Sequence, residues 1–261
     1  MEVVILSDAA ALAQVAADAV ESLLTRKPNA VLGLATGSSP LALYDELTRR
    51  HEAGRVSFAQ ATAFTLDEYV GLPQDDPRSY HHVIREEFTD RVDFRPEAVH
   101  GLDGMASDLA AECAAYEDAI AAAGGVDLQI LGIGTDGHIA FNEPATSLRS
   151  RTRIETLTEQ TRLDNARFFD GDLDRVPRHC LTQGLGTILD ARHLVLFATG
   201  YGKAEAVHQM VEGAVSAMWP ATVLQMHEHA SVLLDDRAAS RLQLADYHRM
   251  VWEHKLEGMG L

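Results

Sequence analysis

Three side chains that can exchange protons near neutral pH fall within eight residues of one glycine-rich segment, LGIGTDGHIAFNEP (residues 131–144). Asp136 and Glu143 flank His138, and carboxylates beside an imidazole orient the ring and set its charge. We therefore expect a proton relay in this segment. The same trio could hold a metal ion, but no second His or Cys stands at ligand spacing, so we expect no metal.

The same segment contains G-I-G-T-D-G, which matches the glycine fingerprint of a dinucleotide-binding turn. That turn should open a helix and be followed about twenty residues later by an acidic residue for the ribose. Here HIAFNEP follows, closed by Pro144, and Glu155 stands at the right distance but inside an Arg-rich run. The context therefore does not favour a dinucleotide.

A second small-residue loop, ATGSSP (residues 35–40), follows an apolar run and precedes a helical pattern. Gly37 permits close approach of the backbone, and Thr36, Ser38 and Ser39 offer hydroxyls beside free helix N–H groups. This arrangement suits a phosphate. An ordinary helix N-cap is the alternative, because Ser and Thr are favoured at that position in any case.

Asp67 and Glu68 directly follow another apolar run, in TLDEYVGLP (residues 65–73). Adjacent residues on a strand point to opposite faces, so one carboxylate could enter a cleft while the other turns away. A carboxylate among apolar neighbours can be tuned as a general base. The alternative is a solvated strand end.

Two cationic side chains complete the set of candidate residues. Lys203 stands at a helix start in FATGYGKAEAV (residues 197–207), where it can reach an anion at the edge of a sheet. Arg167, in NARFF, is the second candidate. A surface lysine and a surface salt bridge are the respective alternatives.

The elements that must position these residues alternate between strand and helix patterns. Nearly continuous Val, Ile, Leu and Ala runs are typical of strands buried on both faces, and the alternation predicts an α/β fold with a mostly parallel sheet and helices on both faces. Ligands in such folds bind at the carboxyl ends of the strands. The strand-like runs cover residues 2–6, 30–36, 61–66, 126–134, 192–200 and 230–236, and the helical patterns residues 8–26, 40–50, 79–88, 105–123 and 203–213, with one more helix at the end.

Residues 142–190 break this alternation. The segment is rich in Arg, Thr and Asp and poor in buried-strand pattern. We interpret it as an excursion over the active face, with a lid within it. The whole chain, residues 1–261, is predicted to form a single α/β domain.

Composition restricts the class of protein. The formal net charge of −17 repels nucleic acid and anionic membranes, so an anionic substrate needs a local cationic pocket. No run approaches the roughly 18 apolar residues of a membrane span, and the first residues lack a basic leader. Cys113 and Cys180 are the two cysteines and lie far apart, which fits a reducing cytoplasm.

Taken together, seven motifs resemble the glucosamine-6-phosphate deaminases of the glucosamine-6-phosphate isomerase/6-phosphogluconolactonase family. The resemblance spans about residues 30–235, in order and spacing, and DGHIAFNEP and DEYVGLP are its most specific segments. The related lactonases share GxGxDGH but lack the FNEP continuation. The motifs are ATGSSP, LDEYVGLP, GIGTDGHIAFNEP, RTRIETLT, NARFFDGDLDRVPRHCLTQGLGTILDA, GYGKAEAV and VEGAVSAMWPATVLQMH.

The resemblance implies a Rossmann-like three-layer sandwich that converts D-glucosamine 6-phosphate and water into D-fructose 6-phosphate and ammonium, without a metal or organic cofactor. Asp67 matches the base that moves the C2 proton to C1. His138 matches the catalyst of ring opening, with Asp136 and Glu143 as its partners. The positions that match the phosphate site are Thr36, Gly37, Ser38, Ser39, Arg167 and Lys203.

Several alternatives stay open. A sugar-phosphate lactonase, a non-catalytic sugar-phosphate sensor and a deaminase of galactosamine 6-phosphate would use the same scaffold. Some family members are activated by N-acetylglucosamine 6-phosphate through basic residues of the RTRI region. Here Arg153 is present but Glu155 would repel a phosphate, so we expect weak or absent activation. A homo-oligomer is possible, and whether His179 or His227 touches the substrate is open.

Overall fold

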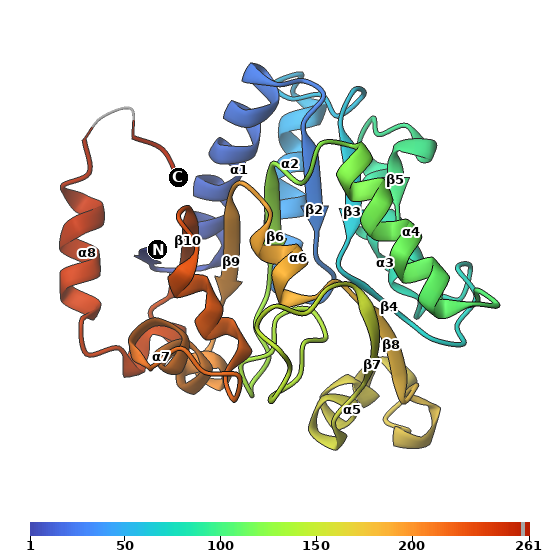
Figure 1. The fold of residues 1–261 in the computed structure, drawn as a ribbon. Coiled ribbons are helices and arrows are strands. Elements are labelled where there is room, and N and C mark those ends of the chain that lie inside the picture. Colours follow the sequence, from blue (N-terminus) through green and yellow to red (C-terminus); the bar gives the residue numbers. More distant parts are fainter. Residues whose placement is uncertain (257–258) are drawn as a thin grey trace.

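The computed structural model describes residues 1–256 and 259–261, and its centre is a seven-stranded parallel sheet (Figure 1). The strands lie in the order β1-β10-β9-β6-β2-β3-β5. Their bounds, in that order, are Glu2–Leu6, Ala230–Asp235, Leu194–Ala198, Leu128–Leu131, Val31–Leu34, Thr62–Thr65 and Val99–His100. Every residue of β2, β6 and β9 is buried, which explains their continuous apolar sequences.

Helices cover both faces of this sheet, with α1 and α2 behind it and α4 and α6 in front of it in Figure 1. The α/β fold predicted from the alternating pattern is therefore confirmed. The helices are α1 (Ala9–Arg26), α2 (Leu41–Glu52), α3 (Tyr80–Glu87), α4 (Leu109–Ala122), α5 (Glu159–Asn165), α6 (Leu185–Leu189), α7 (Ala204–Glu212) and α8 (Ala245–Glu253). Short 3₁₀ helices are η1 (Thr89–Arg91), η2 (Pro96–Ala98), η3 (Ala166–Phe169), η4 (Leu173–Arg175), η5 (Tyr201–Lys203), η6 (Pro220–Met226) and η7 (Ala238–Arg241).

Helix α1 shows how local sequence sets an element. Asp8 precedes it with an extended backbone, and its carboxylate accepts the N–H of Ala11 at 2.9 Å, which caps the helix start. Leu12, Ala16 and Val20 recur every four residues and are buried, so one stripe of the helix packs on the sheet. No helix in the described part of the chain is long and apolar enough to cross a membrane.

The order of strands reverses between β2 and β6. From β2 the chain continues outward to β3 and β5, and from β6 it continues the other way to β9 and β10. Such a reversal separates the loops that follow the two central strands and leaves a crevice at their carboxyl ends. The two glycine-containing loops, residues 35–40 and 132–138, begin at this point.

A second sheet, which the sequence analysis missed, lies below the first in Figure 1. It is antiparallel, in the order β4-β8-β7, with bounds Asp67–Tyr69, His179–Thr182 and Arg153–Thr156. Asp67 therefore does not end a strand of the large sheet. It begins β4, and a single residue, Leu66, separates β4 from the end of β3. A small apolar core supports this sheet and contains Tyr69, Phe141, Leu157, Ala166, Phe169, Val176 and Cys180. The excursion of residues 142–190 is thus partly a sheet, and its movement as a lid stays a prediction.

Candidate active site

The glycines of the loop after β6 make room for an imidazole. The N–H of Gly134 donates to the carbonyl of His138 at 2.8 Å, and a Cβ on Gly134 would lie 2.3 Å from the His138 ring. Gly137 has φ +82°, and a Cβ there would lie 2.7 Å from Trp219. These glycines therefore fit the His138 ring and Trp219 closely.

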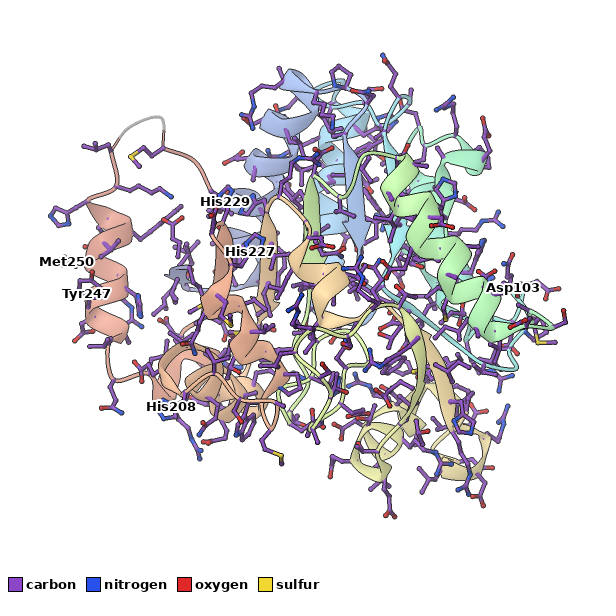
Figure 2. All side chains as sticks on the ribbon, in the orientation of Figure 1. Asp103, His208, His227, His229, Tyr247 and Met250 are labelled. Carbon is purple, nitrogen blue, oxygen red and sulfur yellow. The ribbon has the colours of Figure 1, made fainter. Side chains whose placement is uncertain are left out.

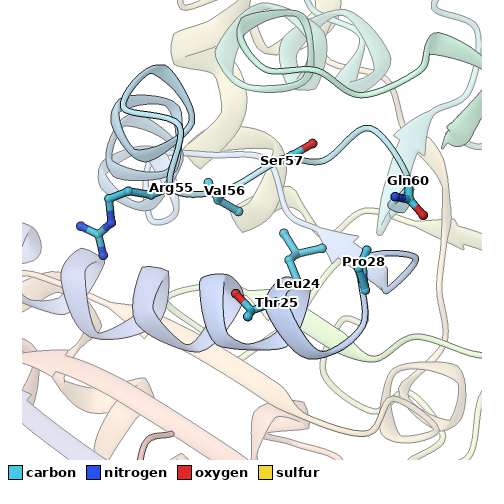
Figure 3. A pocket seen from close by; sticks show the side chains of 7 residues that line it. All are labelled: Leu24, Thr25, Pro28, Arg55, Val56, Ser57 and Gln60. Atoms are coloured by element: carbon cyan, nitrogen blue, oxygen red, sulfur yellow. The ribbon is translucent and has the colours of Figure 1, made fainter.

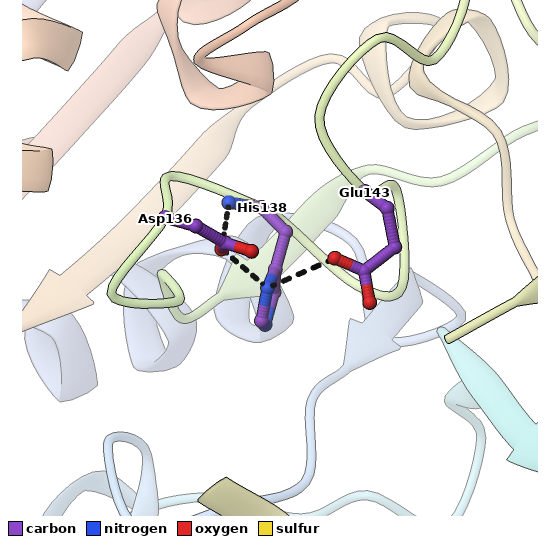
Figure 4. Close-up of side chains that lie close together, drawn as sticks. All are labelled: Asp136, His138 and Glu143. Carbon is purple, nitrogen blue, oxygen red and sulfur yellow. Dashed lines mark hydrogen bonds and ion pairs between the residues drawn. The ribbon is translucent and has the colours of Figure 1, made fainter. Parts of the chain in front are cut away.

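His138 lies between two carboxylates, as Figure 4 shows. Its Nδ1 is 2.7 Å from Oδ1 of Asp136 and 3.8 Å from Oε2 of Glu143. The first contact is an ion-pair approach, and the backbone N–H of His138 also donates to Asp136 at 3.2 Å. Burial opposes ionisation of Asp136, but the hydrogen bond and charge of His138 lower its pKa overall. Burial raises the pKa of Glu143, so the two acids differ in strength.

The segment that carries Glu143 is held in an unusual backbone. Ala140 and Ala145 have φ of +51° and +73°, a region that costs energy for residues other than glycine. Asn142, between them, is fully buried and donates to the carbonyls of Ile139 and Gln183 at 3.0 and 2.8 Å. These bonds hold the strained turn that places Glu143 beside His138.

The trio also meets a geometric requirement for a metal site, since one ligand atom from each residue lies within 4.8 Å of the others. A metal held by both Asp136 and His138 would sit about 2 Å from each ligand atom, which separates those atoms by about 3 Å or more. The 2.7 Å contact between them is too short for an ion to stand between. The arrangement fits a direct contact between the imidazole and the carboxylate better than a cation between them.

Asp67 has a contrasting environment. It is 6% exposed, and its carboxylate makes no hydrogen bond to any other described residue. Burial, and then the charge of Glu68, raises its pKa well above the ordinary value. Uncharged phenols and a thiol surround it, and burial with the added charge of Asp67 raises the pKa of each: Tyr69, Tyr80, Tyr116 and Cys180. Such a carboxylate is suited to take a proton.

Glu68 turns away from Asp67, as adjacent residues of a strand must. Its Oε1 accepts the N–H groups of Tyr69 and Tyr80 at 2.8 and 3.0 Å, and its Oε2 accepts that of His81 at 2.9 Å. Tyr80 and His81 begin α3. Glu68 therefore binds the first turn of a helix that lies twelve residues further along the chain, a role that the sequence analysis missed.

The small-residue loop after β2 lies beside the loop that carries His138. A Cβ on Gly132 would lie 3.5 Å from Oγ of Ser39, so the two loops are in contact at the strand-order reversal. Gly37 has φ +88° and open space around it, and Ser38 is exposed. Helix α2 begins at Leu41, one residue later than predicted, because Pro40 occupies the N-cap. The loop keeps free N–H groups at a helix start, as a phosphate site needs.

Lys203 ends η5, at the start of α7, and is half-buried. Burial lowers its pKa, the charges of Asp164 and Asp136 raise it, and the charge of Arg167 lowers it further. The structure therefore brings both cations to the carboxyl edge of the large sheet, close to the trio. Within residues 1–256 and 259–261 neither Lys203 nor Arg167 forms an ion pair, which leaves them available to an anion.

Sequence reasoning also missed Asp164, which stands three residues before Arg167. Oγ1 of Thr135 donates to Asp164 at 3.1 Å, so α5 is tied to the loop of the trio. The sequence did show that Asp164 stands three residues before Arg167, a spacing that places both on one side of a helical stretch. The pairing with Thr135 had no such signal, because 29 residues separate them.

Two histidines that sequence analysis left open lie elsewhere. His227 precedes β10 at the amino edge of the sheet, where Nε2 is 2.8 Å from the carbonyl of Ala191 (Figure 2). His179 begins β8 and its Nδ1 is 3.3 Å from Thr156, at the end of the strand away from Asp67. Neither joins the candidate site.

A hollow of about 250 Å³ lies near the end of α1, away from the loops of residues 35–40 and 132–138 (Figure 3). Its charged side chain, Arg55, pairs with Glu21 at 2.8 Å and is therefore occupied. It is lined by Leu24, Thr25, Pro28, Arg55, Val56, Ser57 and Gln60.

The chain is similar to known proteins over most or all of its length. The model of the family described as glucosamine-6-phosphate isomerases/6-phosphogluconolactonase matches residues 7–233. The glucosamine-6-phosphate deaminases of Mycolicibacterium smegmatis and Beutenbergia cavernae are each 69% identical over 261 residues, which is 100% of this chain and of each relative.

Solved structures agree in fold. That of a monomeric glucosamine-6-phosphate deaminase has a TM-score of 0.89 at 44% identity, covering 92% of this chain and 99% of that one. The 6-phosphogluconolactonase of Trypanosoma cruzi has a TM-score of 0.74 at 20% identity, covering 93% and 97%. At that identity the second likeness is one of fold alone.

Proposed function

Since this chain belongs to the glucosamine-6-phosphate isomerase/6-phosphogluconolactonase family, we propose that it converts D-glucosamine 6-phosphate and water into D-fructose 6-phosphate and ammonium. The observation that carries this proposal is the presence of two separate proton stations. One is the buried, unpaired Asp67, and the other is His138 between Asp136 and Glu143. A hydrolase of a lactone has no need of the first.

The reaction begins with ring opening, because only the open chain has an aldehyde at C1. His138 moves the proton between the ring oxygen and the C1 hydroxyl, while Asp136 and Glu143 keep its imidazole oriented. The 2.7 Å contact of Asp136 with Nδ1 supports this role.

Isomerisation follows at the second station. Asp67 takes the proton from C2, the electrons form a C1=C2 double bond, and the aldehyde oxygen gains the proton that the substrate's ammonium group gives up. The resulting enolamine is reprotonated at C1 by Asp67, which leaves an iminium at C2. Water adds to that carbon and ammonia departs, so fructose 6-phosphate forms. The raised pKa of Asp67 supports its role, since a stronger base takes a carbon-bound proton more readily.

The phosphate positions C2 near Asp67 without taking part in the chemistry. Arg167 and Lys203 supply positive charge, and the loop at the start of α2 supplies N–H groups and hydroxyls: Thr36, Gly37, Ser38 and Ser39. We further propose that part of residues 142–190 closes over the bound sugar, because Arg167 is carried on it.

The test is ammonium release on addition of glucosamine 6-phosphate, with Asp67→Asn in parallel. Release by the wild-type protein and none by the folded variant supports the deaminase and the assigned base. Hydrolysis of 6-phosphogluconolactone without ammonium release would instead indicate a lactonase. Binding of the sugar with neither product would indicate a sensor.

A further inference from the structure

Glu68 is a carboxyl side chain enclosed by the protein, and its hydrogen-bond contacts favour its ionised form. It is 1% exposed, and its three hydrogen-bond partners, the N–H groups of Tyr69, Tyr80 and His81, are all donors. Burial raises the pKa of Glu68, and these three N–H groups oppose that rise because they stabilise the negative charge. The geometry therefore favours the carboxylate.

No cation forms an ion pair with this carboxylate in the described part of the chain, and the nearby guanidinium of Arg78 pairs with Asp76 at 2.6 Å. The charged neighbours that act on it are Asp67, adjacent in β4, and Asp76, in the turn before α3. His81, whose N–H it binds, has a pKa lowered by burial and is neutral near pH 7. Among the described residues, the direct contacts that offset the charge of Glu68 are backbone N–H groups, that of Tyr69 and those at the start of α3.

Asp67 also forms no ion pair with any described residue. Arg153, which lies two strands away in register with Thr182 and Asp67, pairs with Glu155 instead. The titratable groups around it on β4, α3, α4 and β8 are the three phenols Tyr69, Tyr80 and Tyr116 and the thiol of Cys180, all uncharged near pH 7. The nearest fixed charge described is therefore that of Glu68, which is negative and held in place.

We propose that Glu68 is a positioning residue for proton transfer, which anchors β4 to α3 so that Asp67 faces the cleft, and whose charge makes Asp67 a stronger base. This inference rests on the proposed function, in which Asp67 takes the C2 proton. Glu68 itself does not touch the substrate in this scheme.

The experiment compares the pH profile of kcat/KM for ammonium release in wild type, Glu68→Gln and Glu68→Asp. Removing the charge in Glu68→Gln should move the acid limb about one pH unit lower and reduce the plateau about tenfold, because Asp67 becomes a weaker base. Glu68→Asp keeps the charge, so its acid limb should stay in place even where the plateau falls. The substrate phosphate titrates near pH 6 in all three proteins and cancels in the comparison.

Asp127→Asn is the matched control. Asp127 is a buried carboxylate that accepts the N–H of Val31 at 2.8 Å and pairs with Lys27 at 2.8 Å, at the amino edge of the large sheet. Its loss should lower stability but leave the acid limb unmoved. A folded Glu68→Gln whose limb coincides with that of wild type overturns the proposal, and so does an equal shift in Glu68→Asp.

A direct titration separates failure of this inference from failure of the proposed function. The carboxyl carbon of Asp67 is followed by ¹³C NMR, with Asp67→Asn identifying its signal. A lower midpoint in Glu68→Gln supports the effect of the charge whether or not ammonium is released. An unchanged midpoint overturns it even if the enzyme is a deaminase.

Discussion

Asp67 and Asp136 are the same residue type placed in two opposite environments. Asp136, on the loop after β6, contacts Nδ1 of His138 at 2.7 Å, and this partner holds its pKa below the ordinary value despite burial. Asp67, on the small sheet, lacks a described hydrogen-bond partner, and burial raises its pKa. One carboxylate is kept charged and the other is poised to accept a proton.

The difference follows from the elements that carry them. A loop at the edge of a parallel sheet brings side chains from neighbouring strands together, which supplies ionic partners. A strand of a small sheet packed against aromatic rings excludes such partners. Environments that push the pKa values of two like groups apart are how one protein obtains both an orienting charge and a base near neutral pH.

The largest expected effects come from removing the carboxylate of Asp67 or that of Asp136, one at a time. Asp67→Asn should lower kcat by about a thousandfold or more, because the variant lacks the base assigned to the C2 proton. Asp136→Asn should lower it by about ten- to a hundredfold, since His138 and Glu143 remain. Both are measured as ammonium release from glucosamine 6-phosphate. Equal losses in the two variants would contradict the assignment of separate roles.

Arg167→Ala sharpens the comparison by leaving both aspartates intact. We expect KM for glucosamine 6-phosphate to rise about ten- to a hundredfold, which corresponds to the loss of one charged hydrogen bond. The pH profile should keep its shape. Arg192→Ala is the control, because Arg192 pairs with Asp127 at the opposite edge of the sheet and should leave KM unchanged. A shifted acid limb in Arg167→Ala would contradict a role in binding alone.

The two aspartates should also affect stability with opposite signs. The folded-state pKa of Asp67 is raised, so its stabilising effect is present below the ordinary pKa and is lost as the pH rises through the raised one. Asp67→Asn should therefore raise the free energy of unfolding at pH 7 by about 1 kcal/mol, which raises Tm by roughly 2–4 °C.

The folded-state pKa of Asp136 is lowered, so its contribution is present above the ordinary pKa and is lost as the pH falls. Asp136→Asn should therefore lower Tm at pH 7. Thermal unfolding followed by circular dichroism measures both variants. A lower Tm in Asp67→Asn would show that the carboxylate is stabilised by a partner and would remove the basis of the contrast.

The smallest expected effect concerns activation by N-acetylglucosamine 6-phosphate. Arg153, on β7, donates to Oδ1 of Asn142 at 2.9 Å and pairs with Glu155, so its charge is already occupied. We expect less than a twofold change in kcat or KM with this ligand present. A large activation at sub-millimolar concentration, measured by initial rates, would contradict the expectation.

The sequence predicted the large sheet well because its strands are apolar along their whole length. The apolar runs match β2, β6, β9 and β10 to within a few residues at each end. The small sheet could not be predicted in this way. Strand β7, RIET, alternates between half-buried and exposed residues, and β4 has three residues, too few to show a period.

Site residues were predictable where they share a loop. Asp136, His138 and Glu143 are close in sequence, and the structure brings them together. The hydrogen-bond partners of Glu68 in α3 could not be predicted from the sequence. They are backbone N–H groups twelve and thirteen residues away, and a backbone N–H group is not marked by any residue type. The catalytic roles of these residues stay predictions.

A single residue, Leu66, joins β3 of the large sheet, which ends at Thr65, to β4 of the small sheet, which begins at Asp67. Gln183 holds this connection with two hydrogen bonds. Its backbone N–H donates to the carbonyl of Leu66 at 2.8 Å, and its side-chain amide donates to the carbonyl of Thr65 at 2.9 Å. A connection this short has no slack. Any rotation of the small sheet would therefore also move the carboxylate of Asp67, because Leu66 and the two hydrogen bonds of Gln183 hold the start of β4 at the end of β3.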